Sequence, residues 1–309
     1  MAVKSPKFRD PAVTAQGEPR AVVALRRLDT LWFNTGTLCN IACRHCYIES
    51  SPRNDRLAYL TRTEVAGYLD EIARDGLGTR LIGFTGGEPC MNPDLVGMLA
   101  DVLDRGLSAL VLTNAMQPMT HLRPKLLDLR ARHGARLGVR VSLDHYNAAE
   151  HDAERGPGTW ARTLEGLIWL AQHGFAPDVA GRRFTAEPEE AVRAGYAALF
   201  AKNGIAIDAA DPVRLMLFPE MDPTREVPEI TAACWGLLHK SPDDVMCASA
   251  RMVVRRRDAA APAVLACTLL PYDACFELGT TLAEAARPVA LNHPYCASFC
   301  VLGGGACSR

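Results

Sequence analysis

The chain has 309 residues, a formal net charge of −1 and 49% hydrophobic residues, a composition typical of a globular protein that buries a large core. The near-neutral charge argues against a nucleic-acid-binding chain, and no apolar run approaches the roughly 18 residues of a membrane-spanning helix. The first residues lack the apolar segment of a signal peptide. We therefore expect a cytoplasmic protein with no membrane or nucleic-acid partner, in which residues 1–27 form a flexible N-terminal arm.

Short apolar runs alternate with amphipathic helical patterns between residues 28 and 220. Such runs are typical of buried parallel strands joined by helical crossovers. The predicted strands are Thr30–Thr35, Arg80–Thr85, Ser108–Thr113, Leu137–Leu143, Pro177–Gly181 and Val213–Phe218. Six such units are too few for a closed eight-stranded barrel, and periodicity alone leaves a partial barrel and an open doubly wound sheet as alternatives.

The helices between these strands are indicated by their ends. Thr61 and Glu64 form a capping-box pattern. Asn92 precedes a proline at a predicted helix start, and Gly106 and Gly174 follow predicted helix ends.

The alternation stops after Glu220, where a stretch rich in proline and cysteine begins. It contains one predicted hairpin, Arg251–Arg257 against Ala263–Thr268. We therefore expect one domain over residues 28–225 and a small cysteine-rich C-terminal extension over residues 226–309.

The eleven cysteines fall into two groups. Four lie early in the chain, at Cys39, Cys43, Cys46 and Cys90. Seven lie in the last quarter, at Cys234, Cys247, Cys267, Cys275, Cys296, Cys300 and Cys307. In a reducing compartment, clustered cysteines are more often metal ligands or catalytic thiols than disulfides. Two groups predict two metal sites.

Cys39, Cys43 and Cys46 directly follow the first predicted strand. Three thiolates at this spacing can bind three irons of a 4Fe–4S cube and leave the fourth iron open to another ligand. The alternative is a zinc site, which would need a fourth ligand such as His45.

A second motif, Thr85-Gly86-Gly87-Glu88-Pro89, closes the next predicted strand. Without the cysteines it would be read as an ordinary glycine turn. Together with the Cys-x3-Cys-x2-Cys run and His45 before its last cysteine, it resembles the radical SAM superfamily. The resemblance covers about residues 30–220. It implies a partial (β/α)6 barrel, with Gly86, Gly87, Glu88 and Pro89 binding the amino group of S-adenosylmethionine.

Polar residues at later strand ends extend the resemblance. Ser142 and Asp144 are similar to the family residues that reach the ribose, and Arg182 stands where the family often holds the methionine carboxylate. The alternative is that Asp144 and Arg182 only pair with each other.

Three further residues are candidates for catalysis. Cys90 follows the glycine motif, where its thiol could donate a hydrogen atom or simply pack in the core. His145 and Tyr146 follow the fourth strand, where they could contact substrate and move protons or only shape a loop.

The C-terminal cysteines resemble a shortened SPASM or twitch extension, which implies one auxiliary 4Fe–4S cluster. We expect its ligands among Cys247, Cys267, Cys296, Cys300 and Cys307, with zinc as the alternative. Cys234 and Cys275 are expected to be core or spare thiols.

The resemblance implies an enzyme that reductively cleaves S-adenosylmethionine to a 5′-deoxyadenosyl radical, which abstracts a hydrogen atom from a substrate. The low potential of this step implies an external electron donor such as flavodoxin or ferredoxin. We expect a small-molecule biosynthetic substrate. The alternatives are a peptide, as in peptide-maturing enzymes, or no substrate at all, as in an iron–sulfur electron carrier or scaffold. An RNA substrate is disfavoured, because Arg251 and Arg255–Arg257 form only one basic patch.

Overall fold

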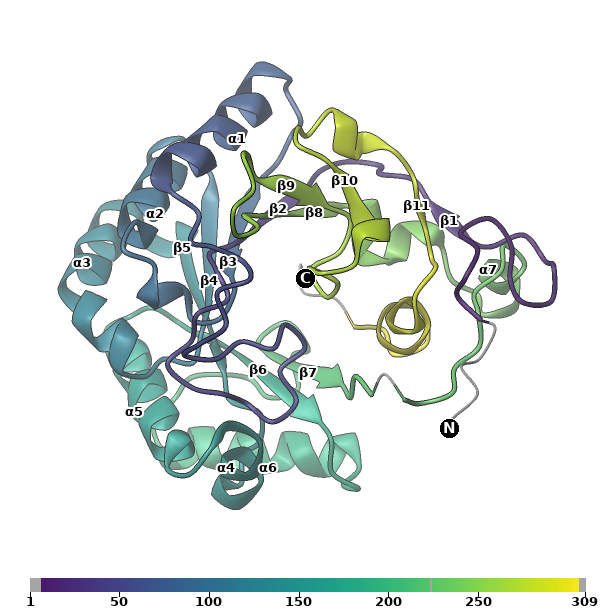
Figure 1. The fold of residues 1–309 in the computed structure, drawn as a ribbon. Coiled ribbons are helices and arrows are strands. Elements are labelled where there is room, and N and C mark those ends of the chain that lie inside the picture. The colour runs from purple at the N-terminus through teal and green to yellow at the C-terminus, as the bar shows by residue number, and fades with distance from the viewer. Residues whose placement is uncertain (1–6, 223, 306–309) are drawn as a thin grey trace.

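The computed structural model describes residues 7–222 and 224–305 (Figure 1). Within them, nine strands form one sheet in the order β10-β9-β8-β2-β3-β4-β5-β6-β7, and β1 pairs with β11 in a small second sheet. The strands are β1 (Val22–Val23), β2 (Thr30–Asn34), β3 (Leu81–Thr85), β4 (Ser108–Thr113), β5 (Leu137–Ser142), β6 (Asp178–Arg183), β7 (Leu215–Pro219), β8 (Ala250–Val254), β9 (Ala263–Leu265), β10 (Glu277–Gly279) and β11 (Val289–Ala290).

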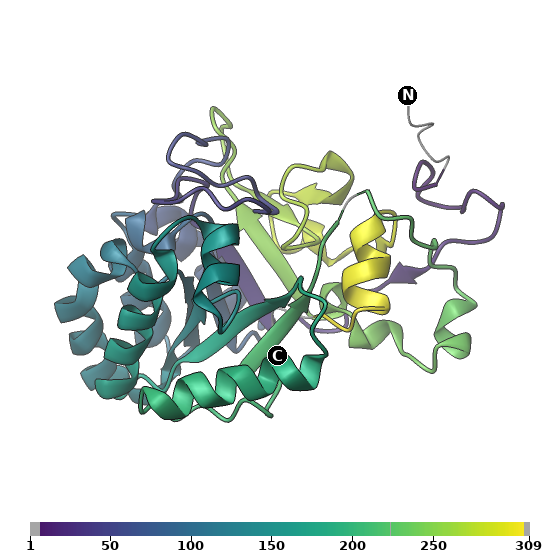
Figure 2. The same cartoon turned by 90° about the horizontal axis from the view of Figure 1, so that it is seen from below.

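Strands β2 to β7 are parallel neighbours in chain order. The helices between and after them are α1 (Arg62–Arg74), α2 (Leu95–Asp104), α3 (Gln117–His133), α4 (Ala148–Arg155), α5 (Thr159–Gln172), α6 (Glu189–Lys202) and α7 (Cys234–Leu237). Figures 1 and 2 show α1 to α6 on the outer face of the curved sheet, with the C-terminal region on its open side. The six predicted strands and the partial barrel are thus confirmed. No helix in the described ranges is long and apolar enough to cross a membrane.

The alternation of side chains along β2 explains how the sheet packs. Leu31 and Phe33 belong to the core shared with α1 and α2, whereas Trp32 belongs to an apolar cluster inside the barrel. Gly83 of β3 is the register partner of Trp32, and a Cβ atom there would lie 2.2 Å from the indole ring. The Trp32 ring therefore packs over Gly83 inside the barrel, where a larger residue at position 83 would collide with it.

The local signals for α1 also hold in the structure. Thr61 accepts a hydrogen bond from the Glu64 N–H, and the Glu64 carboxylate accepts one from the Thr61 N–H, so the predicted capping box is present.

The C-terminal region continues the barrel sheet. The predicted hairpin is present as β8 and β9, which are antiparallel. Strand β8 also pairs in parallel with β2, so Leu31 faces Arg251 across the ladder. The division of the chain near residue 225 stays a prediction, since the sheet runs through both parts.

Part of the expected flexible arm is packed in the structure. Ala21 and Val23 are fully buried, and Val22–Val23 pairs with Val289–Ala290. Arg20 forms a buried ion pair with Glu229, with 2.6 Å between Nη2 and Oε1. This segment has enough apolar and charged partners in the C-terminal region to be held, which its polar composition did not indicate.

Candidate active site

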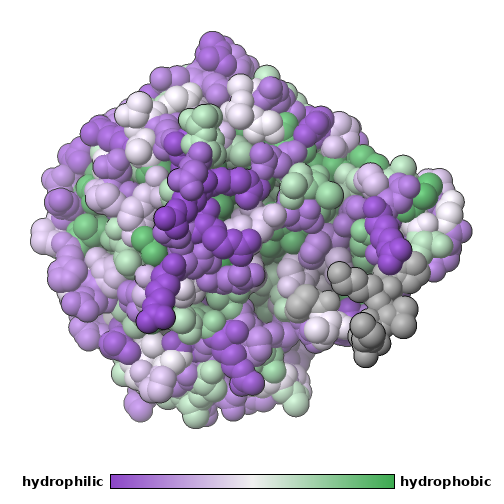
Figure 3. All heavy atoms as spheres, viewed as in Figure 1, coloured by the Kyte–Doolittle hydropathy of each residue, from purple (hydrophilic) through white to green (hydrophobic). Residues whose placement is uncertain are grey.

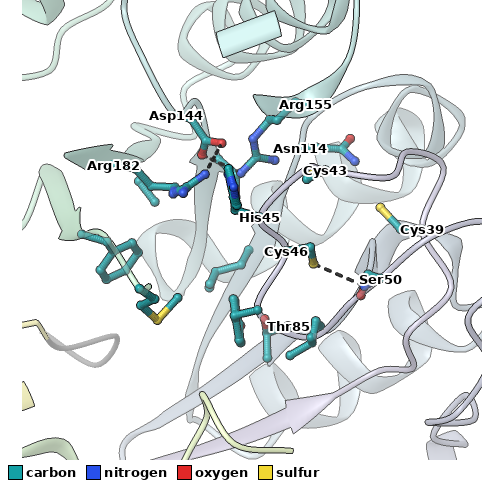
Figure 4. Close-up of a pocket in the computed structure, with 18 of the residues that line it drawn as sticks. Cys39, Cys43, His45, Cys46, Ser50, Thr85, Asn114, Asp144, Arg155 and Arg182 are labelled. Carbon is teal, nitrogen blue, oxygen red and sulfur yellow. Dashed lines mark hydrogen bonds and ion pairs between the residues drawn. The ribbon is translucent and has the colours of Figure 1, made fainter. Parts of the chain in front are cut away.

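A pocket lies at the carboxyl ends of the parallel strands, where the loop after β2 covers them (Figure 4). Figure 3 shows that the molecular face above it is mostly hydrophilic, with apolar atoms towards the centre. The predicted site residues that line the pocket are Cys39, Cys43, His45, Cys46, Gly86, Gly87, Ser142, Asp144 and Arg182. The structure therefore brings together most of the residues selected from the sequence.

The three cysteines of the loop face the same space. Burial, together with the negative charges of Glu88, Cys43 and Cys46, raises the pKa of the Cys39 thiol to about 12. Burial also raises the pKa of Cys43, while the charge of Arg155 opposes this shift. Buried thiols that repel one another as thiolates fit a site where a cationic metal core supplies the missing positive charge.

The pocket offers three thiols as possible ligands. A 4Fe–4S cube takes each thiolate on a different iron, so three thiolates leave one iron open. A zinc site would need a fourth ligand, and Nδ1 of the expected one, His45, lies 2.8 Å from Glu154 Oε2. The three thiols thus fit a cube.

The glycine motif packs against the cysteine loop. The Gly87 N–H donates to the Gly36 carbonyl over 2.8 Å, and the Glu88 N–H donates to the Leu38 carbonyl over 3.1 Å. A Cβ atom on Gly87 would lie 2.2 Å from the Leu38 carbonyl oxygen, and one on Gly86 would lie 2.5 Å from that of Gly36. These glycines therefore allow close approach of the loop backbone, in addition to lining the pocket.

Glu88 does not face the pocket, contrary to the expectation from the motif. Its carboxylate accepts hydrogen bonds from the Cys90 N–H (3.0 Å), the Thr113 hydroxyl (2.8 Å) and the Asn114 N–H (2.8 Å). The side chain is buried, and burial raises its pKa despite these donors. Glu88 thus joins the end of β3 to the end of β4, and the motif reaches the pocket through Thr85, Gly86 and Gly87. Pro89 begins a buried helical turn behind it.

Two arginines flank Asp144 in the pocket. Arg155 Nη2 lies 2.8 Å from Asp144 Oδ1, and Arg182 Nη1 lies 3.5 Å from Oδ2. Burial acts to raise the pKa of Asp144, but the charges of Arg155 and Arg182 hold it below its usual value. The pairing of Asp144 with Arg182, one of the two expected possibilities, is present, and Arg182 also contacts Glu154 and Glu220, each over 2.8 Å.

Helix α4, which the sequence did not indicate, supplies Arg155 and Glu154. Glu154 Oε2 lies 2.8 Å from His45 Nδ1 in the cysteine loop, and its carbonyl accepts the Arg44 N–H over 2.7 Å. Asn147 caps the first turn of α4. The Asn147 cap is therefore a sequence signal from which α4 could have been predicted. The helix buries His151 and Glu154 instead of an apolar stripe, so hydrophobic periodicity does not indicate it.

The three candidate catalytic residues lie outside the pocket lining. Cys90 is buried in the core, with Sγ 3.8 Å from the Thr113 hydroxyl oxygen. His145 Nε2 and the Tyr146 hydroxyl both contact Glu187, over 2.9 and 2.7 Å. This geometry favours the packing and loop-shaping alternatives for all three.

Comparisons with known proteins agree with this geometry. Residues 33–184 match the sequence model of the family described as Radical SAM superfamily. This part of the chain belongs to the radical SAM superfamily. The chain is 35% identical over 139 residues to an AdoMet-dependent heme synthase of Methanosarcina barkeri (strain Fusaro / DSM 804), a match covering 44% of this chain and 37% of that protein. It is 33% identical over 143 residues to the antilisterial bacteriocin subtilosin biosynthesis protein AlbA of Bacillus subtilis (strain 168), covering 46% and 30%. The matches thus span about a third of these curated relatives.

Solved structures share the fold of this chain. SuiB of Streptococcus suis bound to S-adenosylmethionine has a TM-score of 0.59 at 12% identity, covering 82% of this chain and 63% of that chain. The histidine-tagged protein anSMEcpe with bound AdoMet has a TM-score of 0.58 at 15% identity, covering 83% and 79%. At these identities the likeness concerns the fold.

The pocket lining also includes large apolar side chains. Phe218, Met221, Leu269 and Phe299 line it, and the rings of Phe218 and Phe299 lie 5.5 Å apart between centroids. Phe299 comes from a π-helix, Cys296–Val301, in the C-terminal region. The pocket lining thus combines charged and apolar side chains.

Several C-terminal cysteines of this radical SAM protein lie near one another. Burial raises the pKa of Cys296 well above its usual value, and the charges of Cys267 and Cys247 raise it further. Cys300 is half-buried on the same π-helix as Cys296. Cys307 lies outside the described residues. Cys234 accepts a hydrogen bond from the Thr231 N–H, and Cys275 is exposed.

Proposed function

We propose that this protein binds a 4Fe–4S cluster and S-adenosylmethionine in the pocket and abstracts a hydrogen atom from a small-molecule biosynthetic substrate. The observation that carries the proposal is that Cys39, Cys43 and Cys46 share a pocket with the glycine turn and the Asp144–Arg155 pair. Bound there, the two cofactors would supply the chemistry of the reaction, a one-electron cleavage of S-adenosylmethionine to methionine and a 5′-deoxyadenosyl radical.

The residues of the chain bind and orient the cofactors. Cys39, Cys43 and Cys46 would ligate three irons and leave one open. Thr85, Gly86 and Gly87 would border the methionine amino group, and Ser142 would border the ribose. Their places in the lining support these assignments.

Arg155 is a better partner for the methionine carboxylate than Arg182. The Arg182 guanidinium already contacts Glu154 and Glu220 as well as Asp144. Arg155 pairs with Asp144, and among the described residues its buried Nε has no hydrogen-bond partner. An unsatisfied buried donor favours a ligand that supplies an acceptor.

The apolar part of the lining favours a substrate whose reacting part is uncharged. Phe218, Leu269 and Phe299 line the pocket together with the cysteines, so the lining suits a small molecule with an apolar portion. A peptide maturase is the second candidate, because relatives include AlbA and the protein named mycofactocin maturase MftC of Mycobacterium ulcerans (strain Agy99), 28% identical over 138 residues.

A second, auxiliary 4Fe–4S cluster would lie in the C-terminal region. Its ligands would come from Cys247, Cys267, Cys296, Cys300 and Cys307, and the effect of the first two on the Cys296 pKa supports this. An external one-electron donor such as flavodoxin or ferredoxin would reduce the protein.

The test is anaerobic incubation of the reconstituted protein with S-adenosylmethionine and dithionite. We expect slow release of 5′-deoxyadenosine and methionine without substrate, abolished by Cys43→Ala and unchanged by Cys275→Ala, since Cys275 is exposed and away from the pocket. The carrier or scaffold alternative predicts no release from any variant. No release from a fully loaded and reduced protein would refute the proposal.

The substrate class is tested in the producing cell. An untargeted comparison of a deletion strain with its parent should show one altered small metabolite. An altered peptide mass instead would favour the maturase.

A further inference from the structure

Arg251 is a buried cation in the C-terminal region. Its side chain is among the largest that are fully buried, with a relative exposure of 1%. It lies on β8 between Ala250 and Met252, which face the apolar cluster inside the barrel. Because side chains alternate along a strand, Arg251 points to the opposite face. The expected basic surface patch is therefore absent here, and Arg255, Arg256 and Arg257 are each paired with a carboxylate.

The guanidinium of Arg251 is hydrogen-bonded only through backbone carbonyls among the described residues. Nη1 donates to Cys247 (2.6 Å) and Ala250 (2.8 Å), and Nε donates to Ala285 (2.9 Å). Nη2 donates to Arg287 over 3.4 Å. The donors are thus satisfied, but carbonyls supply no net negative charge.

A buried charge without a counter-charge is costly even when its hydrogen bonds are made. The guanidinium instead lies beside Cys247, whose carbonyl accepts a hydrogen bond from Nη1 over 2.6 Å. Cys247 is one of the candidate cluster ligands, so the buried charge adjoins the predicted cluster site.

We propose that Arg251 is the counter-charge of the auxiliary cluster, placed beside Cys247 to hold the cluster in the chain and to raise its reduction potential. The inference rests on the auxiliary cluster of the proposed function. A cluster bound by cysteine thiolates carries net negative charge, and its potential depends on nearby charge and hydrogen bonds. A fixed positive charge favours the reduced form, which carries one more negative charge.

The test uses the full-length chain with Cys39, Cys43 and Cys46 replaced by alanine, so that only the auxiliary cluster remains. Arg251→Gln removes the charge and keeps some donors, whereas Arg251→Lys keeps the charge and loses the fork of donors. Arg256→Gln is the matched control, because Arg256 lies in the same hairpin, just after β8, but pairs with Glu277. Iron content and redox titration followed by electron paramagnetic resonance are the readouts.

At the potential where the parent cluster is half reduced, Arg251→Gln should lower the ratio of reduced to oxidised cluster about tenfold, or about 59 mV for a one-electron couple. Arg251→Lys and Arg256→Gln should stay within about threefold of the parent. An unchanged ratio in Arg251→Gln would overturn the proposal, because a purely structural arginine would leave the potential alone. If Arg251→Gln gives no folded protein, a tenfold shift in Arg251→Lys overturns the proposal and an unchanged ratio supports it.

Failure of this inference is separable from failure of the proposed function. A parent chain that holds zinc or no metal overturns the role of Arg251 whether or not the wild type cleaves S-adenosylmethionine. A wild type that holds both clusters but releases no 5′-deoxyadenosine refutes the function and leaves the role of Arg251 in place.

Discussion

The carboxylate of Glu154 lies 2.8 Å from the ring Nδ1 of His45, although 109 residues separate the two in the chain. The same carboxylate contacts Arg182 over 2.8 Å, and the Glu154 carbonyl accepts the Arg44 N–H. One residue of α4 therefore joins the cysteine loop to β6.

Replacing Glu154 with glutamine should loosen the cysteine loop. Glutamine keeps the shape but loses the charge that faces His45 and Arg182, and a hydrogen bond to a charged group contributes about 1.5–3 kcal/mol. After reconstitution, we expect the iron bound by Cys39, Cys43 and Cys46 to fall by about half or more. The iron of the auxiliary cluster in the C-terminal region should be unchanged. Glu150→Gln, on the exposed side of the same helix, is the control. Wild-type iron content in Glu154→Gln would show that α4 does not position the loop.

The Glu88→Gln variant distinguishes two roles for this carboxylate. The motif resemblance implies that it binds S-adenosylmethionine, whereas in the structure it joins the ends of β3 and β4. The resemblance predicts a loss of S-adenosylmethionine affinity of about 10- to 150-fold, as for a lost charge-assisted hydrogen bond. The structure instead predicts affinity within about threefold of wild type. It also predicts a free energy of unfolding lower by about 1–3 kcal/mol, because the amide group of glutamine faces donors. Equilibrium binding to the oxidised protein and denaturant unfolding measure both quantities. A large affinity loss at unchanged stability would place the carboxylate on the ligand.

Gly87→Ala should displace the cysteine loop. The new Cβ atom would lie 2.2 Å from the Leu38 carbonyl oxygen, and this backbone cannot move without moving Cys39. We expect loss of most iron at the first site. Gly67→Ala in α1 is the matched control, because its Cβ would meet nothing within 4 Å, and alanine in a helix should stabilise by about 0.5–1 kcal/mol. Full iron loading in Gly87→Ala would contradict the packing described here.

The buried Arg20–Glu229 pair predicts how stability depends on pH. Burial acts to raise the pKa of Glu229, but hydrogen bonds from the Ala15 N–H, Arg20 and the Phe8 N–H lower it below its usual value. Because the pKa is lower in the folded state, the contribution is complete above the unfolded value of about 4.3 and is lost as the pH falls through the folded value.

Glu229→Gln should therefore lower the free energy of unfolding at pH 7 by about 3–5 kcal/mol, since it leaves Arg20 buried without a charged partner. The difference from wild type should shrink below about pH 4. Denaturant unfolding at several pH values measures this, with Glu226→Gln as the control because Glu226 is 72% exposed. A difference that does not change with pH would exclude this ion pair as its source.

Those parts of the fold and of the site that depend on local sequence patterns could be predicted from the sequence. The six barrel strands, the capping box at Thr61 and the convergence of Cys39, Cys43 and Cys46 with the strand ends all follow from periodicity and spacing. Arg155 and the orientation of Glu88 could not be predicted in this way. Arg155 sits on a helix without an apolar stripe, and Glu88 turns away from the pocket because donors at the end of β4, distant in sequence, satisfy it. The burial of Arg251 likewise depends in part on the carbonyls of Ala285 and Arg287, more than thirty residues away.

The position of β2 has a consequence for how the chain folds during synthesis. Its partner β3 follows within about fifty residues, but β8, on its other side, is made more than two hundred residues later. Until then the second edge of β2 has unpaired N–H and C=O groups, which can template wrong pairing with other chains. Contacts this distant also slow folding. The nascent protein is thus most vulnerable to aggregation while the ribosome is still making residues 35–250, and the last strands to emerge are the ones that end that exposure.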